Sequence, residues 1–117
     1  MYEQLLPDQE RILGPDHPGT LATRSNIAAL TGRCGGPAEA LRLSQQLLPD
    51  QERVLGPDHP GTLTNRNNMA VWTGRCGRPA EALRLSKKLL PDRQRVLGPD
   101  HPDTLTTRGN IADLTGK

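Results

Sequence analysis

Aromatic and sulfur-containing residues are scarce in this 117-residue chain. It has no Phe, one Trp (Trp72), one Tyr (Tyr2), two Met and two Cys. A protein interior without Phe must be built from smaller apolar side chains, here chiefly Leu and Ala. The two cysteines, Cys34 and Cys76, do not form a C-x-x-C pair, so the sequence contains neither a redox motif nor a zinc motif.

The chain also lacks a strong net charge and any long apolar run. Its 15 Lys and Arg face 13 Asp and Glu, and the small basic excess has no aromatic residues interleaved with it. That pattern is a poor nucleic-acid footprint. No run approaches the roughly 18 apolar residues of a membrane-spanning helix, and the N-terminus MYEQLLPDQE has no signal-peptide character. We therefore expect a cytoplasmic protein with reduced thiols, without nucleic-acid or membrane partners.

One long stretch occurs three times in this sequence. LLPDQERILGPDHPGTL begins at Leu5, LLPDQERVLGPDHPGTL at Leu47 and LLPDRQRVLGPDHPDTL at Leu89, which is a spacing of 42 residues. A fixed period between about 20 and 50 residues is typical of stacked repeats, in which each unit buries its apolar face only against its neighbours. The period therefore predicts a repeat array.

Each repeat is predicted to contain two helices. Pro18 stands in the first turn of a helix that runs to about Gly32, with Asp16 as the expected cap. Pro37 opens a second helix, which continues through Pro49 because the apolar positions keep one helical phase on both sides of it. We expect this helix to lose one hydrogen bond and to bend at Pro49. We predict an all-α solenoid over residues 1–117, with complete repeats at 17–56 and 59–98. Residues 1–14 are the second helix of a truncated repeat, and 101–117 are the first helix of another.

A short motif recurs in register within the repeats. Asn26-Ile27-Ala28, Gly35 and Glu39-Ala40-Leu41 follow the pattern N-[IM]-A…G-x-x-[AE]-E-A-L, which resembles the tetratricopeptide repeat. The 42-residue period and the GPDHP-x-TL junction look like the kinesin-light-chain variety. The combination of LLPDQERVLGPDHP with WTGRCG is similar to arrays in actinobacterial proteins. Thr31, Thr73 and Thr115 depart from the family pattern, which usually has a large aromatic residue there.

The resemblance implies a right-handed superhelix whose first helices line a concave, peptide-binding groove. It implies a protein-interaction scaffold, with no cofactor, no metal and no catalytic residues. In such arrays the Asn of the motif holds the backbone or terminal carboxylate of a bound peptide. A helical wheel places these residues on or beside the groove: Ser25, Asn26, Ala29, Arg33, Thr64, Asn67, Asn68, Val71, Arg75, Asn110 and Asp113.

The differences between the two full units gather near this predicted groove. Residues 5–46 and 47–88 match at 32 of 42 positions, and five of the ten differences fall at positions 22, 23, 25, 29 and 30. A variable surface on a constant frame is typical of a recognition array. Duplication followed by random drift would give the same pattern, so both interpretations stay open.

The recurrent His and Cys residues have structural explanations that we favour over chemical ones. His17, His59 and His101 stand between Asp and Pro, where a helix-entry turn is expected, and no converging ligands accompany them for a metal. Cys34 and Cys76 occupy equivalent places in successive repeats, about 10 Å or more apart, which is beyond the reach of a disulfide.

Trp72 and one recurrent arginine also have two interpretations each. Trp72 lies at the flank of the groove, where packing between units is favoured over stacking on a ligand. The arginine recurs at positions 24, 66 and 108. We expect it to pair with an acid of the hairpin such as Glu39 or Glu81, rather than to form an anion site.

The ends of the array lack the polar capping repeats that solenoids usually need for solubility. We expect either a segment of a longer array, as in a larger signalling or regulatory protein, or a homo-oligomer formed through open repeat ends. The leading hypothesis is a scaffold that binds a peptide or helix of a protein partner along the groove. Self-assembly is the first alternative, and a module attached to a nucleic-acid regulator is the second.

Overall fold

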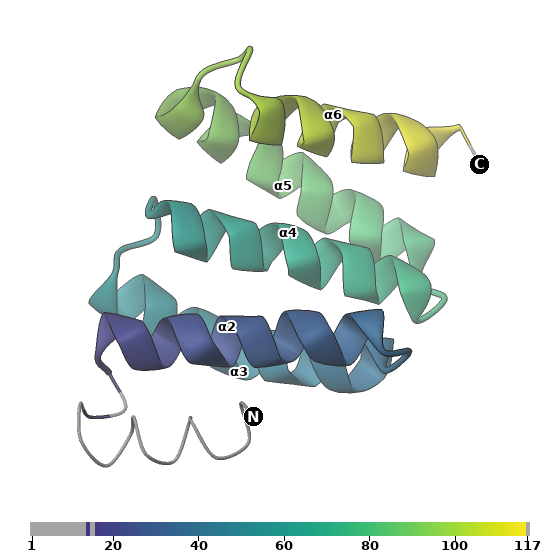
Figure 1. The fold of residues 1–117 in the computed structure, drawn as a ribbon. Coiled ribbons are helices and arrows are strands. Elements are labelled where there is room, and N and C mark those ends of the chain that lie inside the picture. Colours follow the sequence, from purple (N-terminus) through teal and green to yellow (C-terminus); the bar gives the residue numbers. More distant parts are fainter. Residues whose placement is uncertain (1–13, 15, 117) are drawn as a thin grey trace.

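The computed structural model describes Gly14 and residues 16–116, and this part of the chain is helical with no strand. The predicted helix over 1–14 therefore lies almost entirely outside the described residues. The helices, labelled as in Figure 1, are α2 (Pro18–Arg33), α3 (Pro37–Val54), α4 (Pro60–Arg75), α5 (Pro79–Leu97) and α6 (Pro102–Thr115).

The helices form two antiparallel hairpins, α2/α3 and α4/α5, followed by α6 (Figure 1). The first helices α2, α4 and α6 stack in one row, and the second helices α3 and α5 form the row behind them. Each helix packs mainly against the next one in the sequence, as α2 does on α3 and α3 on α4. This nearest-neighbour packing is the all-α solenoid that the 42-residue period predicts.

A histidine caps each first helix. The Nδ1 atoms of His17, His59 and His101 accept hydrogen bonds from the backbone N–H two residues later, at 2.9, 2.9 and 3.0 Å. A proline follows at the first helical position, where its missing N–H costs nothing. The prediction that Asp16 is the cap was therefore wrong, because its neighbour His17 supplies the acceptor and the Asp16 carboxylate points to a different partner.

Each second helix passes through its proline without a break. Pro49 lies inside α3 and Pro91 inside α5, both exposed to solvent, which confirms the prediction of a single helix. The turn into the next first helix then needs a backbone conformation that favours glycine, and Gly56 and Gly98 provide it with φ of 95° and 97°.

The core is narrow and built from Leu and Ala. Leu21, Leu47, Leu63 and Leu89 are each at most 1% exposed, and Ala40 and Ala82 are equally buried between the helices. Threonines fill much of the remaining interior because their hydroxyls bond to backbone carbonyls. Thr62, for example, donates to the Gly56 carbonyl at 2.9 Å, and Thr73 donates to that of Met69 at 2.6 Å.

Candidate functional site

Two cavities lie between successive first helices, on the row that the sequence predicts to form the groove. The first gap, between α2 and α4, holds a cavity of about 240 Å³, which we call the Gln51 cavity. The second gap, between α4 and α6, holds a cavity of about 360 Å³, which we call the Leu114 cavity. The Gln51 cavity is lined by Pro18, Leu21, Ala22, Ser25, Asn26, Gln51, Leu55, His59 and Gly61. The Leu114 cavity is lined by Ala70, Val71, Gly74, Arg75, Ala82, Ser86, Asn110, Asp113 and Leu114.

The Leu114 cavity occupies the place that Trp72 fills one repeat earlier. Trp72 is 6% exposed and packs against Ala40 and Leu41. Its ring lies so close to Gly32 that a Cβ there would overlap the ring carbons. Trp72 thus confirms the prediction of packing between units. It is also partly stacked by Arg75, whose guanidinium carbon is 5.1 Å from the ring centroid.

The space that the Trp72 ring fills, between Gly32 and Ala40, can be called a slot. The second gap has a slot with the same wall residues but a different side chain facing it. Gly74 and Ala82 are 42 residues after Gly32 and Ala40, but Leu114 stands where Trp72 would be. A Cβ added at Gly74 would meet only the Ala82 Cβ, at an ordinary 3.5 Å. The smaller Leu therefore leaves the volume of an aromatic side chain unfilled.

At the other end of the gaps, near the N-termini of the first helices, the first gap holds the cavity and the second gap is filled. Gln51 is 2% exposed; its Nε2 donates a long 3.3 Å hydrogen bond to the Gly61 carbonyl, and its Oε1 has no partner among the described residues. Arg93, its equivalent in the second gap, is 3% exposed and fills the corresponding space with its guanidinium. This guanidinium donates to Thr107 Oγ1 at 2.7 Å and to the Asp103 carbonyl at 3.0 Å. Burial of the charge lowers the pKa of Arg93.

A polar chain ties α4 to α6 across the second gap. The Asn110 Nδ2 donates to Asn67 Oδ1 at 3.3 Å, and Arg93 approaches the same oxygen at 3.5 Å. In the first gap the corresponding contact is absent from the described bonds, because Ser25 stands in place of Asn67. The second gap is therefore closed by polar bonds at one end and open over an apolar floor at the other.

The predicted groove residues divide between these two cavities and the surface beside them. Val71, Arg75, Asn110 and Asp113 line the Leu114 cavity, whereas Ser25 and Asn26 line the Gln51 cavity. Ala29, Arg33, Thr64, Asn67 and Asn68 line neither. Arg33 and Thr64 are exposed, and the other three are half-buried.

Several cavity residues were missed by sequence reasoning. The apolar floor of the Leu114 cavity comes from Ala70, Ala82 and Leu114, and Ser86 and Gly74 complete its wall. A helical wheel of the first helix alone cannot find Ala82 or Ser86, because they belong to α5. The available signal was the comparison of units at two positions, where Trp72 becomes Leu114 and Gln51 becomes Arg93.

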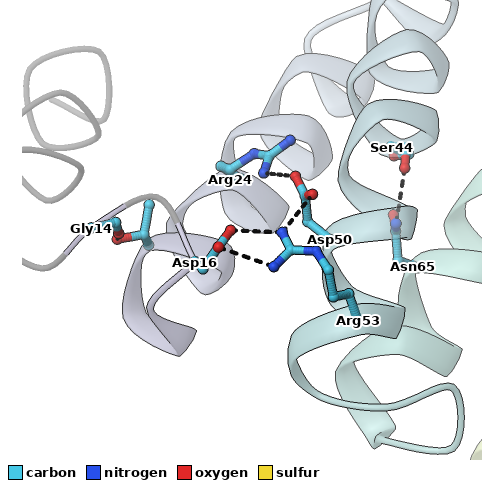
Figure 2. Close-up of polar contacts among 8 residues, drawn as sticks. Gly14, Asp16, Arg24, Ser44, Asp50, Arg53 and Asn65 are labelled. Carbon is cyan, nitrogen blue, oxygen red and sulfur yellow. Dashed lines mark hydrogen bonds and ion pairs between the residues drawn. The ribbon is translucent and has the colours of Figure 1, made fainter.

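Ion pairs join the two helices of each hairpin at the end opposite the short connection. Figure 2 shows Arg24 paired with Asp50 at 2.7 Å, and Arg53 paired with both Asp50 and Asp16. We call this set of two arginines and two aspartates a clamp. It recurs as Arg66, Asp92, Arg95 and Asp58, with Arg66 at 2.6 Å from Asp92 and Arg95 at 2.9 Å from each Asp58 oxygen.

The clamps confirm that Arg24 and Arg66 pair with an acid of their own hairpin, correct which acid it is, and explain two pKa shifts. Arg24 does not pair with Glu39, nor Arg66 with Glu81, because each glutamate pairs instead with the arginine three residues later in its own helix. The hydrogen bond from Arg24 lowers the pKa of Asp50, and that from Arg66 lowers the pKa of Asp92.

Other residue types offer no second site in the described part of the chain. Cys34 and Cys76 are free thiols, one exposed and one half-buried. No three His, Cys, Asp or Glu side chains of the described residues come close enough to hold a metal ion. None of the helices described here is long and apolar enough to cross a membrane.

Comparison with known proteins places the chain in a family. The tetratricopeptide repeat model matches residues 21–91 and 65–116. The fold is similar to a crystal structure of nearly identical TPR-like repeats from a Podospora anserina protein described as a kinesin light chain, with a TM-score of 0.85 and 26% identity. A single-substitution variant of that structure gives a TM-score of 0.86, also at 26% identity. Among curated proteins, none matches the chain.

The matches cover 97% of this chain but only 54% and 53% of those two solved chains, so it spans about half of their length. The family model extends over both hairpins and α6, and the fold agrees over the same helices. The chain belongs to the tetratricopeptide repeat family, with repeats similar to those of the kinesin-light-chain type.

Proposed function

We propose that the row of first helices binds a peptide or a helix of a partner protein, with one large apolar side chain of the partner seated in the Leu114 cavity. Tetratricopeptide repeats generally mediate protein–protein interaction and are typically non-enzymatic scaffolds, which supports this choice over catalysis. The observation that carries the proposal is a cavity of about 360 Å³ in the place that Trp72 fills one repeat earlier.

The lining of the cavity suits an aromatic or long aliphatic side chain. Its floor is apolar, and its rim carries the side chains of Arg75, Asn110 and Asp113. Arg75 already stacks over one aromatic ring, that of Trp72, and a second ring in the cavity would meet the same residue. Asn110 offers both a donor and an acceptor, the combination that holds a peptide backbone. Arg75 and Asp113 carry opposite charges. We therefore expect them to select polar or charged groups of the partner next to the apolar side chain in the cavity.

The Gln51 cavity is the second contact point that we propose for the same partner. Its volume, about 240 Å³, is smaller, and Gln51 Oε1 presents a buried acceptor without a partner among the described residues. A buried acceptor of this kind favours a ligand group with an N–H or O–H. A bound segment would thus place an apolar side chain in the second gap and a donor in the first.

Filling the Leu114 cavity from within tests this proposal. The substitution Leu114→Trp restores the residue of the preceding repeat, and we expect it to remove binding of the probe N-acetyl-tryptophanamide at the second gap. Binding is measured by NMR, through shifts of the methyl groups of Ala70, Ala82 and Leu114 in the unmodified protein, and through the loss of ligand line broadening in the variant. The matched control is Leu30→Trp, the same change at the equivalent position of α2, where the residue lines neither cavity and is 40% exposed.

The outcome separates the cavity from the rest of the surface. Binding that survives Leu114→Trp, or shifts confined to residues outside the second gap, would contradict the proposal. N-acetyl-isoleucinamide serves as a second probe, and a weaker shift with this branched aliphatic group than with the indole would support an aromatic anchor.

Self-assembly through the repeat ends is the second candidate function, and one observation favours it. Leu105 on α6 is 47% exposed, although its equivalents Leu21 and Leu63 are 1% exposed. A bare apolar face of this kind is where an additional helix packs in a solenoid.

A further inference from the structure

The Gln51 cavity contains a buried hydrogen-bond acceptor that the protein itself leaves unused. Gln51 is 2% exposed and lines the cavity, and its Oε1 has no partner among the described residues. Its Nε2 makes only one long bond, at 3.3 Å, to the Gly61 carbonyl. Because a buried acceptor without a partner is costly, a ligand that donates to Oε1 would recover that cost on binding.

The second gap shows which kind of group fits at this place. Arg93 stands one repeat after Gln51, and its guanidinium donates at 3.0 Å to the carbonyl of Asp103, the equivalent of Gly61. The same guanidinium donates to Thr107 Oγ1 at 2.7 Å. A planar group with several N–H donors therefore fills, in the second gap, the space that is a cavity in the first.

The charges around the two gaps differ, and the difference disfavours a cation in the first. Burial lowers the pKa of Arg93, and the negative charge of Asp103 opposes that shift. The first gap has Gly61 in place of Asp103, and no Asp, Glu, Lys or Arg lines the Gln51 cavity. A guanidinium or ammonium group would lose its hydration there without a carboxylate to compensate. A planar N–H group without charge is the better match.

The rest of the lining offers hydrogen-bond donors to the same ligand. His59 Nδ1 accepts the Gly61 N–H at 2.9 Å, so the proton of the neutral imidazole is on Nε2, which is then a donor. Ser25 adds a hydroxyl and Asn26 an amide. The remaining wall is apolar and consists of Pro18, Leu21, Ala22 and Leu55. A group that both donates and accepts, on a short apolar stem, matches this lining.

We infer that the Gln51 cavity selects a neutral primary carboxamide, the side chain of a Gln or Asn of the partner. Its N–H donates to Gln51 Oε1, and its carbonyl accepts from the neutral donors of the opposite wall. This inference rests on the proposed function and gives the first gap its class of ligand. The bound segment thus carries a carboxamide for the first gap and a large apolar side chain for the second.

Three probes with the same backbone test this selectivity on the full chain. They are the N-acetyl, N-methylamide derivatives of glutamine, leucine and arginine, so only the side chain differs. Binding is followed by NMR, through the methyl signals of Leu21, Ala22 and Leu55. We expect the glutamine derivative to bind about fivefold more tightly than either of the others, on the order of one hydrogen bond to a buried acceptor.

Substitutions at Gln51 assign the selectivity to its carbonyl oxygen. Gln51→Met removes the acceptor from a side chain of similar length, and it should bring the glutamine and leucine derivatives to equal affinity. Gln51→Glu offers only acceptors and a negative charge, and it should turn the preference toward the arginine derivative. The matched control is Gln45→Glu, the same change on the exposed surface of α3, which should leave the preference unchanged. Circular dichroism checks the folding of each variant, and Gln51→Met decides the matter if Gln51→Glu does not fold.

Each contrary result has a distinct meaning. Equal affinity for the three derivatives in the unmodified protein, or a glutamine preference that survives Gln51→Met, would overturn the inference. The absence of any shift at the first gap would overturn it as well. None of these results touches the Leu114 cavity, which carries the proposed function and is tested separately by N-acetyl-tryptophanamide and Leu114→Trp.

Discussion

The two gaps between successive first helices share a frame and differ in which end is filled. In the first gap Trp72 fills the end near the helix C-termini, while Gln51 leaves the other end open. The second gap is the reverse. Arg93 fills the end that corresponds to Gln51, and the smaller Leu114 leaves a cavity at the end that corresponds to Trp72. Two substitutions between repeats are therefore enough to move a cavity from one end of the groove to the other.

This difference shows how a repeat array can change its binding surface without changing its fold. The walls of both slots are glycine and alanine, and the clamps that hold the hairpins have the same geometry in both units. Because the frame is held by other residues, the side chains at positions 72, 114, 51 and 93 are free to vary in size.

Among the variants that test this comparison, removal of the Trp72 ring should have the largest effect on stability. Trp72→Leu gives the first gap the residue of the second, and we expect it to cost about 2–4 kcal/mol of unfolding free energy because a large buried side chain leaves a cavity. The variant should also gain a second site for N-acetyl-tryptophanamide. Urea denaturation followed by circular dichroism measures the first effect, and NMR titration measures the second. A stability loss without a new site would mean that the slot collapses.

Two glycines in matched positions sharpen the comparison further. Gly32→Ala should destabilise the protein by about 1–3 kcal/mol, because the added methyl overlaps the Trp72 ring. Gly74→Ala should instead stabilise it by up to about 1 kcal/mol, because Ala favours a helix interior over Gly and the methyl meets only the Ala82 Cβ, at an ordinary 3.5 Å. Thermal melts of the two variants at one pH decide the matter. Equal shifts of the same sign would show that the second slot is not an empty copy of the first.

The clamps should respond to acid equally in the two repeats, with the smallest effect of the set. Arginine hydrogen bonds hold the folded-state pKa of Asp50 and Asp92 below the usual value. The ionised carboxylates therefore stabilise the folded chain above about pH 4, the ordinary Asp pKa, and the contribution is lost as the pH falls through the lower folded value. Melting temperatures measured between pH 7 and pH 2.5 should fall over this window.

Asp50→Asn and Asp92→Asn should flatten that pH dependence to a similar extent, because each removes the same two ion pairs of its clamp and leaves the third, Arg53 with Asp16 or Arg95 with Asp58, in place. The control is Asp113→Asn, whose carboxylate has no ion pair among the described residues. A much larger loss for one clamp than for the other would show that the two hairpins are not energetically equivalent.

The repeat architecture could be predicted from the sequence because its signals are local and recur three times. Pro18, Pro60 and Pro102 mark the helix starts, and the apolar phase on both sides of Pro49 and Pro91 marks one helix rather than two. The predicted helix cap, Asp16, was wrong by one residue, because His17 is the cap. Asp and His can both accept a hydrogen bond at a helix N-terminus, and only the side-chain direction decides between them.

Parts of the candidate site were beyond the same reasoning because their residues come from different helices. The helical wheel placed Val71, Arg75, Asn110 and Asp113 on one surface, and these do line one cavity. It could not add Ala82 or Ser86 from α5, nor could it choose Asp50 over Glu39 as the partner of Arg24. Those choices depend on the distance between helices, which a single-helix pattern does not contain.

The sequence by itself determined the period, the helices and the family, because a 42-residue repeat with fixed Pro and Gly positions specifies the hydrogen bonds and turns of each unit locally. Only the tertiary structure decided where the cavities lie and which charges pair. A cavity is the difference between the space that neighbouring helices enclose and the side chains that enter it, and the enclosed space exists only once α4, α5 and α6 have packed.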